Sequence, residues 1–421
     1  MKYHKTLAYG LLPLIALKYL MDVLYVPIVY EEAFGFSTKM HFLEIPLYIL
    51  AAVFLIREVK AGVIFVHLAF LTTVVRYAVI TVWDIKDGVI SYIIQDIVWL
   101  IFVLIILVVN IIYYKKNPLG ASGYQFPLAE ENYESKKMIV FKSIILTVMM
   151  LFVTLSTISI LSDLNNITFT LINNKMNLSL LKQENVSRAC FHIAYFLELF
   201  VGIWLAVVMN KSGIVSFEKQ GLGSKKEPVK NILIGFLVAL LVVVLACIIL
   251  KIMGSGFSLN KIYPRIIYGM SLSVVYFIGV AVFEEVISRG VILGYCVKHG
   301  MKAWGVIWSS IYFVAMHFIT GAYSKLTQAV FLAGGALLYA ALLMYSRNLF
   351  LCIGYHFMYD WAVTHLVEIR TLNNKEAIIS VLKLTYWKQA ICIAIPTVVI
   401  ALVLFVMAKN KEERIKSLYI K

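Results

Sequence analysis

Long apolar runs separated by short polar segments dominate this chain. A helix that crosses a bilayer needs about 20 predominantly apolar residues, and twelve runs come near or exceed that length. The second run is short and the eighth is long. The pattern therefore predicts an all-α fold, a polytopic bundle of about twelve transmembrane helices. The expected helices cover 6–30, 42–56, 61–83, 89–113, 138–161, 188–210, 231–253, 266–297, 303–320, 326–345, 349–366 and 386–408.

The composition agrees with a membrane protein. Of the 421 residues, 62% are hydrophobic and 14% are charged, whereas a soluble domain is about half apolar and about a quarter charged. The net charge is +15. Because the lysines cluster in loops that flank the apolar runs, this charge is typical of contact with an anionic bilayer surface. We expect no nucleic-acid partner.

The distribution of lysine and arginine predicts the orientation of the chain. With the N-terminus in the cytoplasm and the runs alternating, the loops 114–137 and 211–230 and the tail from 409 lie inside, and they are rich in lysine. The loops expected outside, which include 31–41 and 162–187, are poorer in basic residues. Cytoplasmic loops carry the excess of lysine and arginine in such proteins. We therefore predict a multi-pass protein of the cell membrane with both termini cytoplasmic.

The polar loop 114–137 divides the chain most clearly. It separates four N-terminal spans from a block of eight. We predict an N-terminal transmembrane extension at 1–137, a core at 138–370, and a last span with a basic cytoplasmic tail at 371–421.

Three charged residues lie inside the eighth apolar run, in "FEEVISRG": Glu284, Glu285 and Arg289. A charge at membrane depth costs about 3 kcal/mol or more, so such residues are paired or functional. Glu285 and Arg289 are spaced i, i+4 with the acid first, the better orientation for an ion pair. We assign them to each other. Glu284, about 100° round the helix, is then the free carboxylate.

Distance along the helices predicts the partners of Glu284. Glu284 and His317 each lie about 15 residues, or roughly 22 Å, from the turn 298–302. They therefore fall at a similar depth on antiparallel neighbours. His356 and Asp360, which share one helical face, enter from the same side after the turn at "SRN". The four ionisable residues can converge and activate a water, with Glu284 as general base. The alternative is a buried polar network that only holds helices together.

A family resemblance rests on three motifs: "EEVISR", "FVAMH" and "HFMYD". They resemble the E-E-x-x-x-R, F-x-x-x-H and H-x-x-x-N/D motifs of the CPBP family, the CAAX-prenyl-endopeptidase and bacteriocin-processing (Abi) type of intramembrane proteases. The resemblance covers roughly 188–370. It implies a protease-like core in which Glu284 activates water with His317. Glu285 and Arg289 would hold the site or contact substrate, and His356 and residue 360 would support the oxyanion.

Two points stay open at this stage. The family has been described both as metalloproteases and as metal-independent glutamate proteases, and Glu284, His317, His356 and Asp360 could bind a divalent metal such as zinc. An ionised Asp360 cannot donate a hydrogen bond to an oxyanion. Asp360 would then be protonated, orient His356 or ligate a metal, and of these we expect it to orient His356 through a hydrogen bond.

The expected function is an intramembrane endopeptidase that acts on a peptide or a membrane-anchored protein in the lipid bilayer. One alternative is a non-catalytic bacteriocin immunity or scaffold protein with the same fold. A twelve-span transporter is a third reading, against which the chain shows no internal repeat.

Other charges in the apolar runs are expected to be structural. Lys18 and Asp22 are an i, i+4 pair, and Arg76 and Asp96 could pair between helices. Glu198 is the exception that we expect nearest to the chemistry, because it falls in the core block.

Overall fold

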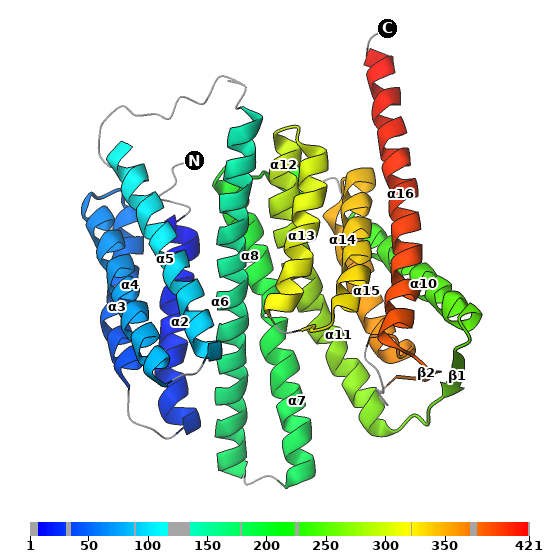
Figure 1. Cartoon of the computed structure of the whole chain (residues 1–421), viewed down its shortest axis with the longest axis horizontal. Helices are drawn as coiled ribbons and strands as arrows, with labels where there is room; N and C mark the ends of the chain where they lie inside the picture. Colours follow the sequence, from blue (N-terminus) through cyan, green and yellow to red (C-terminus); the bar gives the residue numbers. More distant parts are fainter. Residues whose placement is uncertain are drawn as a thin grey trace. The chain divides into compact units, whose positions relative to one another are not determined.

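The computed structural model describes residues 7–30, 35–87, 90–116, 135–176, 179–223, 227–320, 322–370 and 377–419. The all-α prediction is confirmed (Figure 1). Within the described residues, two short strands, β1 (Gly256–Leu259) and β2 (Ile379–Leu382), pair antiparallel, with Gly256 opposite Leu382. The chain divides into two compact units, 1–133 with 153–190, and 134–152 with 191–421. The expected domain boundaries at 137 and 370 stay a prediction.

The helices of the first unit come from the N-terminal third of the chain. They are η1 (Leu7–Leu11), α2 (Leu12–Tyr25), η2 (Val26–Tyr30), α3 (Phe36–Ile56), α4 (Ala61–Asp87) and α5 (Ile90–Lys116), where η marks a π-helical stretch. α3 packs between α2 and α4, and α4 packs on α5. α6 (Lys136–Met176) and α7 (Leu180–Phe196) contribute residues to both units.

The second unit holds the remaining elements. They are α8 (Glu198–Lys211), α9 (Phe217–Gln220), α10 (Pro228–Ile252), β1, α11 (Pro264–Glu285), η3 (Val286–Leu293), α12 (Gly294–Lys298), α13 (Lys302–Ile319), α14 (Leu326–Ser346), α15 (Leu349–Trp361), η4 (Ala362–Leu366), β2 and α16 (Tyr386–Tyr419). Figure 1 shows α16 running beside α14, and α10 packs on α15.

Nine helices in the described parts of the chain are long and apolar enough to cross a membrane. The count of twelve is therefore not confirmed. The expected spans at 303–320 and 349–366 are helical, the first as α13 and the second as α15 continued by η4 to Leu366, but neither is among the nine. The run expected at 89–113 contributes one shorter apolar helix, Trp99–Lys115.

Two sequence expectations about helix ends were wrong. The loop expected at 162–187 is mostly helical, because α6 continues for 41 residues to Met176 and α7 begins at Leu180. This stretch is rich in asparagine but contains neither proline nor glycine, the residues that end helices most strongly. The second span is not short, since α3 begins at Phe36 and has 21 residues.

The turns that bring the site together are those expected. α12 ends at Lys298 and α13 begins at Lys302, and Gly300 between them has φ +74°. A left-handed conformation of this kind suits glycine, which has no Cβ. At the next turn Asn348 caps α15, since its side chain accepts a hydrogen bond from the backbone N–H of Phe350 at 3.0 Å.

Two glycines let α10 and α15 cross in direct backbone contact. A Cβ placed on Gly354 would lie 2.4 Å from the carbonyl oxygen of Ile232, and one on Gly235 would lie 2.4 Å from that of Leu351. Such distances exclude any side chain unless the helices separate. The sequence analysis did not identify this pair. This crossing fixes the position of α15, the helix that carries His356 and Asp360.

The first unit contains a series of charged side chains in contact, of which His41, Glu44 and Arg76 are buried. Lys18 contacts Asp22, as expected, and His41 lies between Asp22 (Nε2 to Oδ2, 3.4 Å) and Glu44 (Nδ1 to Oε2, 2.9 Å). Arg76 donates its Nε hydrogen to Glu44 at 3.1 Å. The expected partner of Arg76, the side chain of Asp96, lies outside the described residues.

Candidate active site

The two glutamates close α11, and a π-helical stretch follows them directly. η3 covers Val286–Leu293, and every residue in it is buried. A π-helical insertion within a longer helix is uncommon and is found frequently at functional sites. Here the segment remains one continuous apolar run, Ile266–Lys298. The π-helical stretch η3 begins directly after the acidic pair and contains Arg289.

Arg289 is fully buried and makes the expected ion pair with Glu285. Its Nη1 lies 3.3 Å from Oε1 of Glu285, and its Nη2 donates to the carbonyl of Ala336 on α14 at 3.1 Å. The guanidinium also lies over the rings of Phe313 and Tyr339, at 4.4 and 4.6 Å from their centroids. A buried guanidinium is stable when its charge is paired and its N–H groups have acceptors. Arg289 thus ties η3 to α13 and α14.

Glu285 also binds His356, a contact between helices that the sequence analysis did not anticipate. Nδ1 of His356 lies 2.9 Å from Oε1 of Glu285, and both side chains are buried. A carboxylate paired with arginine is ionised and accepts hydrogen bonds. Nδ1 therefore carries the hydrogen, and the second nitrogen, Nε2, is left to face the site.

His317 is oriented in the same way by the backbone of its own helix. Its Nδ1 lies 2.8 Å from the carbonyl oxygen of Phe313, one turn earlier on α13. A carbonyl oxygen only accepts, so Nδ1 donates and Nε2 is free for another contact. The ring of His317 stacks on that of Tyr323, with centroids 5.7 Å apart. The histidine is therefore fixed on two sides.

Glu284 lies between the two histidines. Its Oε2 is 3.9 Å from Nε2 of His317 and 3.8 Å from Nε2 of His356. Both separations exceed a hydrogen bond, so Glu284 contacts neither imidazole nitrogen directly. The Oε2 atom is buried, and none of the described residues lies within hydrogen-bonding distance of it. The structure thus brings together Glu284 and His317, as the depth argument predicted, and adds His356 as a second imidazole.

Asp360 does not orient His356, contrary to expectation. Its Oδ2 is 3.7 Å from Nε2 of His356, too far for a hydrogen bond. The same oxygen accepts a hydrogen bond from Nη1 of Arg370 at 2.9 Å. Arg370 was not predicted, because it lies beyond the last helical turn, where no periodicity indicates the direction of a side chain. The available signal was an arginine close behind the apolar run, in "HLVEIR".

Three further polar side chains surround the same space. The phenol of Tyr276 on α11 lies within electrostatic range of Glu284, Asp360 and Arg370. Tyr323, in the turn before α14, is near the same three groups and contacts Arg370. Glu198, buried at the start of α8, lies within range of Glu284. This position agrees with the expectation that Glu198 lies near the candidate catalytic residues.

The four residues considered for a metal do not form a metal site in this geometry. Three or more protein ligands would need to surround a zinc ion at about 2.0–2.2 Å. In the described part of the chain, no group of three or more His, Cys, Asp or Glu side chains could hold an ion. Glu284, His317, His356 and Asp360 lie near one another without converging on one point, and we derive no step through a metal.

Gly290 and Gly294, spaced G-x-x-x-G, lie against short neighbouring segments. A Cβ on Gly294 would lie 3.0 Å from the carbonyl oxygen of Lys219, in α9. Gly290 has looser neighbours, Leu349 and Gln220, at 3.5 Å or more. The tight approach is therefore to α9 and not to a spanning helix.

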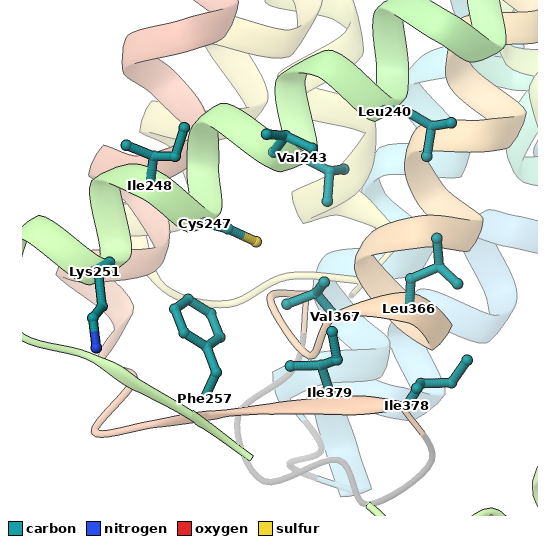
Figure 2. Close-up of a pocket in the computed structure, with 11 residues that line it drawn as sticks. Leu240, Val243, Cys247, Ile248, Lys251, Phe257, Leu366, Val367, Ile378 and Ile379 are labelled. Atoms are coloured by element: carbon teal, nitrogen blue, oxygen red, sulfur yellow. The ribbon is translucent and has the colours of Figure 1, made fainter. Parts of the chain in front are cut away.

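An apolar cavity of about 680 Å³ lies in the second unit, between α10, η4 and the two strands (Figure 2). Its wall includes Val243, Cys247, Phe257 and Ile379, and Lys251 is the charged residue in its lining. Leu366 and Val367, which also line it, precede Arg370 by a few residues. The sequence analysis did not predict this cavity.

Comparison with known proteins identifies the segment that carries the acidic pair and both histidines. Residues 266–362 match the Rce1-like family, described as type II CAAX prenyl endopeptidase Rce1-like. The match confirms the CPBP resemblance for this segment. No curated protein and no solved structure matches the chain. The Rce1-like segment indicates a hydrolase of the intramembrane protease kind, in a multi-pass membrane protein. Arg370 lies outside it.

Proposed function

We propose that this protein is an intramembrane endopeptidase in which Glu284 activates water for attack on a peptide bond. The observation that carries the proposal is the position of Oε2 of Glu284, at 3.8–3.9 Å from the Nε2 atoms of both histidines. Each acid of the site other than Glu284 and Glu198 has a guanidinium partner: Glu285 has Arg289, and Asp360 has Arg370. Of Glu284 and Glu198, Glu284 lies within 3.9 Å of both histidines, so it is the carboxylate available as a base.

The proposed reaction uses one water between Glu284 and the histidines. As the water oxygen bonds to the carbonyl carbon, Glu284 takes a proton from it. His317, with its Nε2 toward Glu284, orients the water. The carbonyl oxygen becomes an oxyanion, and the carbon–nitrogen bond then breaks as the proton passes from Glu284 to the leaving nitrogen. General-base assistance of this kind contributes about 10²–10⁴-fold to rate.

We propose a substrate with a lipid-modified or membrane-embedded segment next to the cleaved bond, as the family description suggests. The apolar cavity supports this assignment. Its volume of about 680 Å³ is within the range of about 300–1,000 Å³ that is typical of ligand sites. Its wall begins at Leu366, roughly 9 Å along the helical path from Asp360 at 1.5 Å per residue. A prenyl or acyl chain fits such an apolar lining.

The full chain in liposomes, with an internally quenched peptide that ends in a farnesylated CAAX box, provides the test. We expect cleavage by the wild type and a loss of about 10²–10⁴-fold in Glu284→Gln. Glu413→Gln, on the exposed end of α16 with a side chain 64% exposed, is the matched control and should cleave normally. The proposal fails if Glu284→Gln retains the wild-type rate, or if neither the farnesylated peptide nor its unmodified form is cut.

A further inference from the structure

The charge of Asp360 limits the role that this side chain can have in the site. Its carboxylate is paired with Arg370 at 2.9 Å, so it is ionised and accepts hydrogen bonds only. An oxyanion needs N–H or O–H donors, and an ionised acid would repel it. Asp360 therefore cannot stabilise the oxyanion itself. The hydrogen-bond donor attached to Asp360 is the guanidinium of Arg370.

We propose that Arg370 donates the hydrogen bond that stabilises the substrate oxyanion, and that Asp360 holds its guanidinium in place. The inference rests on the proposed endopeptidase activity. It assigns a role to a residue beyond the segment that matches the Rce1-like family, which ends at 362.

The first support is that Arg370 faces the reacting groups. The Oδ2 atom that binds Arg370 is the one that lies 3.7 Å from Nε2 of His356, the nitrogen directed at Glu284. Tyr276 and Tyr323 each lie within electrostatic range of both Arg370 and Glu284. The guanidinium therefore borders the same space as the general base.

The second support is that hydrogen bonds fix the backbone of Arg370. The backbone carbonyls of Ile369 and Arg370 both accept hydrogen bonds from Nε2 of Gln389 on α16, each at 2.6 Å. The backbone N–H of Arg370 donates to Val363 at 3.1 Å, and the guanidinium lies 5.5 Å from the ring centroid of Phe277. Donors that are fixed before the reaction stabilise developing charge without reorganisation.

The third support is that the guanidinium of Arg370 has enough donors, and enough exposure, to bind a substrate oxygen. A guanidinium carries five N–H donors in a planar fork, so the bond to Asp360 leaves others for a substrate oxygen. The side chain of Arg370 is 23% exposed, whereas Arg289 is fully buried. Arg370 is thus the guanidinium of the site that a substrate can reach.

The test compares Arg370→Gln, Arg370→Ala and the double variant Asp360→Asn with Arg370→Gln, in liposomes with the farnesylated quenched peptide. We expect Arg370→Gln to lower kcat by about 10²–10³-fold, the usual effect of removing one oxyanion donor, with KM changed little. The double variant should recover most of that loss, since the asparagine amide can donate to the oxyanion and no charge is left unpaired. Lys261→Gln, an exposed basic residue after β1, is the matched control.

Chemical rescue separates a direct role from a structural one. Guanidinium ion added at millimolar concentration should restore hydrolysis by Arg370→Ala and should not restore Glu284→Gln. If Arg370→Gln cleaves at the wild-type rate, or if neither guanidinium nor the second substitution restores activity, the role of Arg370 is overturned. Loss of cleavage in Glu284→Gln would still support the proposed function in that case. A wild type that cleaves nothing would reject both proposals.

Discussion

His356 donates its Nδ1 hydrogen to Oε1 of Glu285 at 2.9 Å. The second glutamate of the acidic pair therefore positions a histidine that lies 71 residues further along the chain. Glu285 also pairs with Arg289, so one carboxylate links η3 to α15. The two adjacent glutamates have different roles: Glu285 is enclosed and paired, and Glu284 faces the two imidazoles.

Replacing Glu285 by Gln should lower kcat by up to about 10⁴-fold, the effect of replacing by its amide a carboxylate that fixes the tautomer of a catalytic histidine. The amide keeps the size of the side chain but removes the charge that fixes the Nδ1 hydrogen of His356. Cleavage of the farnesylated quenched peptide measures the effect, with Glu413→Gln as control. A variant with unchanged kcat would show that His356 does not need this orientation.

Filling the apolar cavity should impair lipidated substrates selectively. In Figure 2 Cys247 points from α10 into the cavity, so Cys247→Trp would occupy space that the lipid chain needs. We expect KM for the farnesylated peptide to rise by about tenfold, a loss of about 1.4 kcal/mol of binding, while the unmodified peptide is unaffected. Leu241→Trp, at an exposed position of the same helix that does not line the cavity, is the control. Equal effects on both peptides would contradict a lipid site there.

Removal of divalent metal should leave hydrolysis unchanged. The proposed reaction uses Glu284 as base, and among the described residues no group of three His, Cys, Asp or Glu side chains could hold an ion. The measurement is the cleavage rate after dialysis against 1,10-phenanthroline and EDTA. Loss of activity that zinc restores, and that cadmium or cobalt restores with altered kinetics, would show instead that a metal is needed.

Substitution at the crossing of α10 and α15 should destabilise the second unit. A Cβ on Gly354 meets the backbone of Ile232 at 2.4 Å, whereas a Cβ on Gly335 meets nothing closer than 3.8 Å. Gly354→Ala should therefore cost about 3 kcal/mol or more through overpacking, and Gly335→Ala should be nearly neutral. Thermal unfolding in detergent compares them. Equal midpoints for the two variants would mean that the helices separate at little cost.

The parts of the site that follow from helix geometry were predictable from the sequence. The i, i+4 spacing predicted the pair of Glu285 and Arg289, and the distances from the turn at 298–302 predicted that Glu284 and His317 lie near each other. The contact of Glu285 with His356 was not predictable, because it depends on how α15 rotates against α11. That rotation is set by the glycine crossing with α10, which apolar periodicity does not reveal.

The all-α class of the fold was predictable from the sequence, whereas the ends of individual helices were less predictable. Apolar runs indicated the helices, but the loop expected at 162–187 is mostly helical, because asparagine does not end a helix as proline or glycine does. In a helix without proline or glycine, flanking isoleucine and leucine keep the chain helical. The partner of Asp360 was missed for a related reason: Arg370 follows the end of η4, where neither the period of a helix nor that of a strand applies.

The two hydrogen bonds from Gln389 to the carbonyls of Ile369 and Arg370 connect the backbone at Arg370 to α16. A side-chain amide offers two N–H donors, and both of these bonds come from the same amide nitrogen. A fragment cut to residues 266–362 would retain Glu284, His317 and His356 but would lack Arg370 and the helix that anchors it. If Arg370 stabilises the oxyanion as proposed, the smallest active piece of this protein is longer than the segment 266–362 that matches the family.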